Sequence, residues 1–210
     1  MAEMHPLTQA IISGDKMAAT ELTQQCLHDG EAPGAIIEER LVPGMAVIGE
    51  RFQCDEIFVP EMLIAANAMK ASLAILEPLI AESGERAPHT AVIGTVQGDL
   101  HDIGKNLVGM MWRGANFAVI DLGVNVTPAD FAAAVVEHQP DIVGMSALLT
   151  TTVPHMREAV AAVKASGVDT KVLVGGAPVS AEFAEEVGAD GFAEDAGAAA
   201  DVARRLVGVA

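Results

Sequence analysis

The spacing of apolar residues divides the sequence into two parts. Up to residue 83, apolar positions recur at helical spacing, which predicts helices over residues 7–14, 15–30, 34–52 and 59–80. Gly14 and Gly30 end the first two helices, whereas Pro43 and Pro60 fit the first turns of new ones. Short helices joined by short loops predict an antiparallel helical bundle over residues 1–83.

From Thr90 the pattern changes to short apolar runs rich in β-branched residues, at positions 90–96, 117–123, 141–147, 171–176 and 190–195. Helical patterns alternate with them, at positions 103–113, 128–138, 155–166, 181–187 and 196–207. This alternation predicts an α/β domain over residues 90–210, a Rossmann-like or flavodoxin-like doubly wound parallel sheet of five strands. The polar residues 84–89 between the two parts are expected to form a linker, with a mobile hinge at residues 82–89.

Composition narrows the function classes. The chain is 51% apolar but only 3% aromatic, so its core must rely on small aliphatic side chains. A net charge of −17 argues against a nucleic-acid partner. No uninterrupted apolar run approaches the ~18 residues of a membrane span, and the N-terminus lacks a signal-peptide pattern. We therefore expect a cytoplasmic protein with no membrane partner, in which Cys26 and Cys54 are reduced thiols without metal-site spacing.

Ligands of parallel sheets bind outside the carboxyl ends of the strands, where this chain has GDLHDIG, SALLTTT and GGAP. The first segment differs from a phosphate-binding loop, because five residues instead of four separate Gly98 and Gly104, and Asn106 follows Lys105. No dinucleotide fingerprint is present. A phospho-acceptor receiver domain needs an aspartate where Ser146 stands. A flavin- or nucleotide-binding module remains an alternative for this edge of the sheet.

His101 lies between two aspartates, and two interpretations are open. It is either a loop histidine beside Asp102 as a helix cap, or a metal ligand whose ring is oriented by Asp99. Zinc requires three or four protein ligands, and no second histidine or cysteine is near in the sequence. A single protein ligand suits a metal that arrives inside a macrocycle. The other strand ends favour a slot with small walls. Ser146 and Thr150 supply hydroxyls after the third strand, and Gly175 and Gly176 remove side chains after the fourth.

The pattern Asp99-x-His101-x-x-Gly104, then Ser146-x-Leu148, then Gly175-Gly176 resembles the cobalamin-binding signature of methionine synthase and its relatives. The segment GERFQCDEIFVPEMLIAANAMKASLAIL is similar to the helical cap module that precedes the cobalamin domain in methyl-transferring members. The length and two-module organisation resemble the stand-alone corrinoid proteins of methyltransferase systems.

The resemblance implies roles for individual residues. His101 would ligate cobalt from below and displace the cofactor's dimethylbenzimidazole, the arrangement called base-off/His-on. Asp99 and Thr152 would form a proton relay with His101, because a protonated imidazole cannot bind the metal. Further cofactor contacts are expected from the histidine loop (Gly98, Leu100, Asp102, Ile103, Gly104), the slot for the nucleotide tail (Ser146, Leu148, Thr150, Gly175, Gly176), its closure (Phe192, Ala193, Ala196) and the upper face of the corrin (Phe52, Val59, Met62). For the last three, ordinary helix core is the alternative.

The resemblance also implies a function. The chain would be a carrier, not itself catalytic, that accepts a methyl group on Co(I) and passes it from methyl-Co(III) to a thiol or folate acceptor. Its expected partners are a substrate methyltransferase of the methylamine, methanol or methoxylated-compound type, an acceptor methyltransferase and a reductive activase. The alternative is a cobalamin-dependent sensor or regulatory module without methyl transfer; an adenosylcobalamin mutase subunit would carry a barrel and lack the helical cap.

Overall fold

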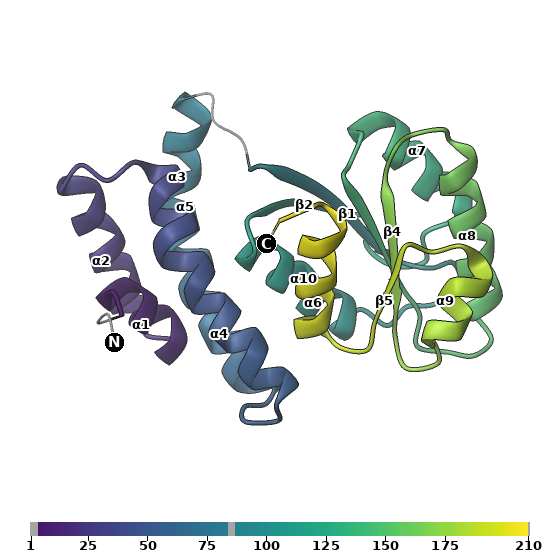
Figure 1. Ribbon diagram of the computed structural model, residues 1–210, viewed down its shortest axis with the longest axis horizontal. Coiled ribbons are helices and arrows are strands. Elements are labelled where there is room, and N and C mark those ends of the chain that lie inside the picture. Colours follow the sequence, from purple (N-terminus) through teal and green to yellow (C-terminus); the bar gives the residue numbers. More distant parts are fainter. Residues whose placement is uncertain (1–3, 84–86, 210) are drawn as a thin grey trace. The chain divides into compact units, whose positions relative to one another are not determined.

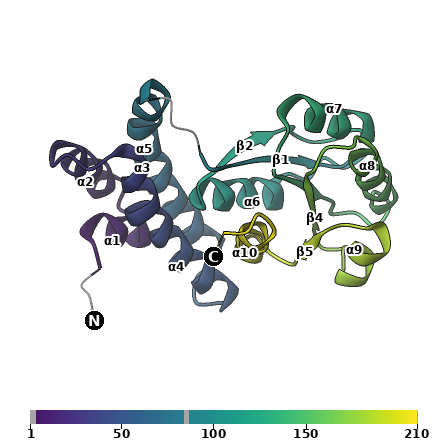
Figure 2. The same ribbon diagram turned by 45° about the horizontal axis from the view of Figure 1, so that its top comes forward.

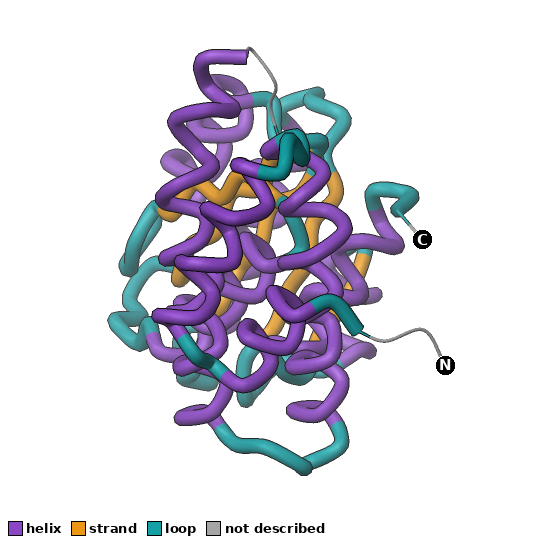
Figure 3. Tube along the Cα trace, turned by 90° about the vertical axis from the view of Figure 1, so that its left-hand side faces the viewer, coloured by secondary structure: helices purple, strands orange, loops and turns teal. Residues whose placement is uncertain are grey.

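The computed structural model describes residues 4–83 and 87–209, so that residues 84–86 of the expected linker lie outside the described part. The chain forms two compact units (Figure 1). The first comprises residues 1–88 with 114–116, and the second comprises residues 89–113 with 117–210. The first unit contains helices joined by short turns and loops, and every described strand, drawn in orange in Figure 3, belongs to the second.

The helical unit contains, in chain order, α1 (Pro6–Ser13), α2 (Lys16–His28), α3 (Pro33–Ile36), the π-helical segment η1 (Ile37–Leu41), α4 (Val42–Gln53) and α5 (Val59–Ser83). The helix ends follow from local chemistry. Asp15 caps α2 by accepting a hydrogen bond from the Ala18 N–H at 3.0 Å. Gly14 ends α1 with φ 69°, and a Cβ there would overlap Ile64.

Pro43 begins a helix as expected, but no loop precedes it. Residues 36–42 stay helical, and the segment η1 carries the chain from α3 into α4 with π-type geometry. Proline has no N–H to donate to the preceding turn, and a π-type turn is a known way for a helix to absorb such an irregularity. The helical pattern of residues 34–52 predicts a break at Pro43, but the chain stays helical through this point and only its hydrogen-bond pattern changes.

Among the described helices, α5 bears on the expectation that the chain has no membrane-spanning segment. Val59–Ile80 is long and apolar enough to cross a membrane by length and composition, with a mean hydropathy of 1.5. The same helix buries Met62, Met69 and Leu76 inside the helical unit, as a core helix of a bundle does. A buried hydrogen bond of 3.0 Å from Thr23 Oγ1 to Ser72 Oγ joins it to α2.

The second unit is a five-stranded parallel sheet in the order β2-β1-β3-β4-β5. Its elements, in chain order, are β1 (His89–Thr95), α6 (Ile103–Gly114), β2 (Phe117–Asp121), α7 (Pro128–His138), β3 (Ile142–Ser146), α8 (Val153–Ala165), β4 (Lys171–Gly175), α9 (Ala181–Val187), β5 (Gly191–Ala193) and α10 (Ala196–Leu206). Helices cover both faces, α6 and α10 on one and α7, α8 and α9 on the other (Figure 2). The predicted doubly wound α/β fold is confirmed.

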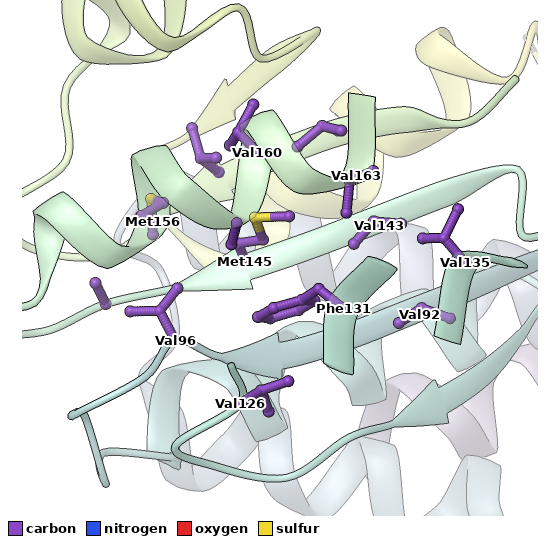
Figure 4. Packing of buried hydrophobic residues seen from close by; sticks show 14 of the residues in the cluster. Val92, Val96, Val126, Phe131, Val135, Val143, Met145, Met156, Val160 and Val163 are labelled. Carbon is purple, nitrogen blue, oxygen red and sulfur yellow. The ribbon is translucent and has the colours of Figure 1, made fainter. Parts of the chain in front are cut away.

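The core of this unit is built from valine, alanine and methionine, with aromatics placed over glycines. On the α7–α8 face, Phe131 lies among Val92, Val143 and Met145 (Figure 4), and a Cβ at Gly94 would approach its ring to 2.9 Å. On the opposite face, a Cβ at Gly144 would lie 2.6 Å from Trp112. Because packed interiors leave no spare volume, Gly94 and Gly144 each make the space that one large ring requires.

Candidate functional site

The strand order places two loops at the switch point of the sheet. Strand β1 pairs with β2 on one side and with β3 on the other. The chain therefore continues to one side of β1 after β1 and to the other side after β2. The loops that follow β1 and β3 therefore meet outside the carboxyl ends of the strands, where ligands of such sheets bind. These loops contain the histidine segment and the segment from Ala147 to Thr152.

Asp99 joins the two loops through its buried carboxylate. Its Oδ2 accepts hydrogen bonds from the Leu148 N–H at 2.8 Å and the Leu149 N–H at 3.2 Å. The Thr152 hydroxyl lies 2.9 Å from the same oxygen and 2.8 Å from the Leu149 carbonyl, and its one hydrogen serves one of these acceptors at a time. Oδ1 accepts from the His101 N–H at 3.0 Å and lies 2.7 Å from His101 Nδ1. The carboxylate thus fixes the β3–α8 loop against the histidine loop.

The charge of Asp99 follows from these contacts. Burial would by itself raise the pKa of Asp99, because a buried carboxylate loses its hydration. The hydrogen bonds from the backbone of Leu148 and His101, and from the side chains of His101 and Thr152, outweigh burial and lower the pKa well below its usual value. Asp99 is therefore ionised at neutral pH and acts only as an acceptor.

An ionised Asp99 determines the tautomer of His101. Since Asp99 can only accept, Nδ1 must carry the hydrogen in the 2.7 Å contact, which leaves the lone pair of the neutral ring on Nε2. The His101 side chain is 51% exposed, and Nε2 has no hydrogen-bond partner among the described residues. The buried Thr95 hydroxyl donates to the His101 carbonyl at 3.0 Å and holds the backbone of the loop. The result is an oriented, part-exposed imidazole whose Nε2 lone pair is available to a ligand.

Two further groups support this loop and were not found from the sequence. Asn125, in the left-handed region with φ 56°, accepts from the Gly98 N–H at 2.8 Å and donates its own N–H to the Asp99 carbonyl at 3.0 Å. Lys105 is only 3% exposed, and its Nζ contacts the two carboxylate oxygens of Asp121 at 2.7 and 2.6 Å. The one sequence signal for this support is the asparagine at position 125, because asparagine tolerates positive φ and is typical of a turn.

Exposed apolar side chains flank the Asp99–His101 pair in the two loops. Leu100 and Ile103, on either side of His101 in the chain, are 71% and 73% exposed, and Leu148 and Leu149 are also exposed. Single exposed apolar residues are common, but a group of them around an available ring nitrogen is typical of a binding surface for an apolar ring.

The glycines of the predicted site serve different purposes. A Cβ at Gly104 would meet nothing within 4 Å, so the protein's own packing does not require glycine there, and the open space fits a close-lying ligand. Gly98 has φ 81°, which favours glycine. A Cβ at Gly175 would lie 2.7 Å from the Ala193 carbonyl oxygen, and one at Gly176 would overlap that of Ala147. In this structure the last two glycines thus face neighbouring backbone.

A single imidazole ligand, an apolar surround and room at Gly104 fit a metal held in a large apolar ring, and the family comparison agrees. One family model, described as B12 binding domain, matches residues 89–203, and a second with the same description matches residues 4–77. The chain belongs to the B12-binding domain family.

The relatives of this B12-binding protein are similar along its whole length. A corrinoid protein of Desulfitobacterium hafniense (strain Y51) is 41% identical, with 99% of each chain covered. Dimethylamine corrinoid protein 3 of Methanosarcina acetivorans is 36% identical, with 97% of this chain and 96% of the relative covered.

Solved structures agree with the fold. The methanol:cobalamin methyltransferase complex of Methanosarcina barkeri matches with a TM-score of 0.85 at 27% identity, over 97% of this chain and 78% of that one. A cobalamin-binding protein of Desulfitobacterium hafniense DCB-2 matches with a TM-score of 0.81 at 33% identity, over 98% and 99% of the two chains.

The other candidate residues of the B12-binding domain lie at the same edge of the sheet but differ in access. Ser146 ends β3 half-buried, and Thr150 is exposed in the following loop. Phe192 packs partly against the core on the α7–α8 face. Ala193 and Ala196 are buried, with 7% and 6% exposure. Asp102, at the start of α6, is exposed and accepts from Asn106 Nδ2 at 3.0 Å.

The candidate residues of the helical unit differ in how deeply their side chains are buried. Met62 is 1% exposed and belongs to the core of that unit, so in this structure it has the alternative role of core residue. Phe52, near the end of α4, and Val59, at the start of α5, are half-buried. Phe58, which the sequence analysis did not single out, is 66% exposed in the same α4–α5 connection. The pattern cannot separate these positions, because helical spacing assigns a face and not a degree of exposure.

Proposed function

We propose that this chain is a methyl carrier that binds a corrinoid base-off/His-on, with His101 Nε2 as the lower ligand of cobalt. The observation that carries the proposal is the oriented imidazole, in which Nδ1 donates to the ionised, buried Asp99 and the Nε2 lone pair is available to a ligand. A carboxylate behind a ligating histidine fixes the ring and strengthens the metal bond. Cobalamin binding of the family and the methylamine and methanol systems of the relatives support it.

The protein's own residues then set the strength of the histidine ligand. While Nδ1 donates to Asp99, Nε2 is basic and unprotonated and can bind a metal. When the ring also takes a proton on Nε2, the lone pair is used and the ligand is released. Thr152 can donate to Asp99 or turn to the Leu149 carbonyl, so it adjusts how strongly Asp99 attracts the imidazole proton. This exchange is the proposed relay.

When bound, the corrinoid supplies a cobalt ion that takes a methyl group from one partner's substrate and gives it to another's. Leu100, Ile103 and Leu148 would contact the apolar ring, and the open space at Gly104 would admit it close to the backbone. Ser146 and Thr150 would bind polar groups of the nucleotide tail. Phe52 and Val59 of the helical unit would shield the upper face from water.

The proposed partners are a substrate methyltransferase of the methylamine or methanol type, an acceptor methyltransferase that uses a thiol or folate, and a reductive activase. The names of the relatives support the first of these. We place the protein in the cytoplasm. Both cysteines are free thiols and Cys54 is exposed, which suits a reducing compartment.

The test uses the full chain loaded with hydroxocobalamin, beside His101→Ala and, as a control that removes an exposed histidine at the end of α7, His138→Ala. The wild type and His138→Ala should show the same protein-bound spectrum, and His101→Ala a different one. Each loaded protein is then reduced and incubated with isotopically labelled methylamines or methanol and the matching methyltransferase. The proposal predicts label on the wild-type corrinoid with one of these systems. It is contradicted if none labels it while each labels its own corrinoid protein.

A further inference from the structure

A second group of metal-ligand side chains lies in the helical unit. His5 is the N-cap of α1, Cys26 is in the last turn of α2, and Glu31 follows in the connection to α3. The imidazole, thiol and carboxylate ligand atoms of these residues all lie within 4.8 Å of one another. The Glu31 N–H donates to the Cys26 carbonyl at 3.0 Å, so the turn that brings the two together is closed by the backbone.

The burial and the raised pKa of Cys26 make this thiol unsuited to act as a nucleophile or a redox sensor. Cys26 is 4% exposed, and burial, followed by the hydrogen bond to Glu31 and its charge, raises the pKa of the thiol to about 11. A buried thiol that is protonated at neutral pH is a poor nucleophile and a poor redox sensor. Arg40 lies 3.2 Å from Glu31 Oε2, so the other carboxylate oxygen remains for the thiol or for an ion.

We propose that His5, Cys26 and Glu31 bind one divalent ion of the zinc class. Imidazole, thiolate and carboxylate are the three ligand types that zinc takes from proteins, whereas Mg²⁺ and Ca²⁺ avoid sulfur. Three protein ligands leave the fourth tetrahedral position for water or a partner's side chain. On binding, the S–H bond of Cys26 breaks, its electron pair forms the S–metal bond, and the proton goes to solvent.

The ion also competes with a helix cap. His5 Nδ1 accepts the Leu7 N–H at 3.2 Å, and this lone pair is lost whichever ring nitrogen ligates. If Nδ1 binds the ion, its lone pair is used directly, and if Nε2 binds, Nδ1 carries the hydrogen. The metal would then replace one weak cap bond by a link between the start of α1 and the end of α2. The sequence has no metal-binding spacing motif for this site, because the packing of α1 against α2, and not closeness in the sequence, brings His5 to Cys26.

The experiment uses the full chain without corrinoid, carrying Cys54→Ala and His101→Ala. In this background Cys26 is the one thiol and the exposed loop imidazole is absent. The chain is freed of metal with a chelator and titrated with Co²⁺ as a coloured substitute for Zn²⁺. We expect a thiolate-to-cobalt charge-transfer band that saturates at one ion per chain, release of protons, and loss of the band on adding Zn²⁺.

Ligand variants in the same background complete the test. Cys26→Ala should abolish the band, and His5→Ala and Glu31→Gln should each weaken Co²⁺ binding at least about tenfold. Circular dichroism identifies folded variants, and the two non-cysteine variants carry the test if Cys26→Ala does not fold. The proposal is overturned if the folded background chain shows no sulfur band, or if His5→Ala and Glu31→Gln bind Co²⁺ as tightly as that chain. Either result leaves the corrinoid proposal untouched.

Discussion

Replacing Asp99 by asparagine tests the geometry of the site in the protein alone. The amide keeps one oxygen, which is best placed at Oδ2, facing the Leu148 and Leu149 N–H groups and Thr152. Its NH₂ group then faces the His101 N–H, now 3.0 Å from a donor instead of an acceptor. The shape of the side chain is unchanged, so the effect reports hydrogen bonding and charge.

The size of the effect follows from these contacts. Leaving the His101 N–H without an acceptor costs about 1–3 kcal/mol, and the part-exposed position of His101 argues for the lower half of that range. The remaining bonds change from charge-assisted to neutral, which costs roughly 1 kcal/mol more after the buried charge is removed. We expect Asp99→Asn to lower the free energy of unfolding by about 2–3 kcal/mol at pH 7.

The effect should depend on pH with a definite sign. The pKa of Asp99 is lowered on folding, so its ionised form stabilises the folded chain above the unfolded carboxyl pKa of about 3.9. This contribution is lost as pH falls through the lower pKa of the folded state. The contribution of the Asp99 charge to the difference between wild type and Asp99→Asn should therefore shrink as the pH falls below about 4.

Guanidinium denaturation of both proteins without cofactor, followed by circular dichroism, measures this difference. Asp102→Asn is the matched control, because Asp102 is exposed and contacts only Asn106 among the described side chains; we expect a change within about 0.5 kcal/mol. A loss below about 0.5 kcal/mol for Asp99→Asn, or a difference that does not shrink below about pH 4, would refute the reasoning.

The remaining predictions concern the support of the same loops. Gly176→Ala should cost at least about 3 kcal/mol, because φ is 120° and a Cβ would overlap backbone, and thermal unfolding of the purified protein measures it. Gly104→Ala, in open space on a helix, should change stability by less than about 1 kcal/mol yet weaken corrinoid binding by equilibrium titration; unchanged binding would contradict the proposed contact. Lys105→Met should cost about 1–3 kcal/mol by denaturant titration, because it leaves Asp121 without its cation, and the partial exposure of Asp121 limits that cost. Lys164→Met, from an exposed pair, should cost under about 1 kcal/mol. Equal effects of the two lysine variants would contradict this account.

The sequence was sufficient for the parallel sheet and for the place of the histidine loop. Period and turn residues identify strands and helices, and the ligand position of doubly wound sheets then places residues 98–104 and 146–152 at one edge. The sequence could not show that Asp99 is buried or that it binds the Leu148 and Leu149 N–H groups. Backbone donors are the same for every residue type, so these partners have no signal in the sequence.

The remaining differences also have physical causes. Phe58 directly precedes α5 and Met62 lies in its first turn, and only the packing of neighbouring helices makes Met62 buried and leaves Phe58 exposed. Pro43 predicts the start of a helix correctly, but the π-type turn before it depends on how the chain absorbs a missing N–H. Lys105 looks like a surface residue of a polar helix start, and Asp121, from a distant strand, is what permits its burial.

The most direct test of the corrinoid proposal is electron paramagnetic resonance of the cobalamin-loaded chain reduced to Co(II), prepared with ordinary and with ¹⁵N-labelled histidine. If His101 Nε2 is the axial ligand, the nitrogen hyperfine lines should change from triplets to doublets on labelling, and the His101→Ala protein should lose this change. If the labelled protein keeps its triplets, the axial nitrogen belongs to the cofactor's own benzimidazole, and the proposed role of His101 is wrong.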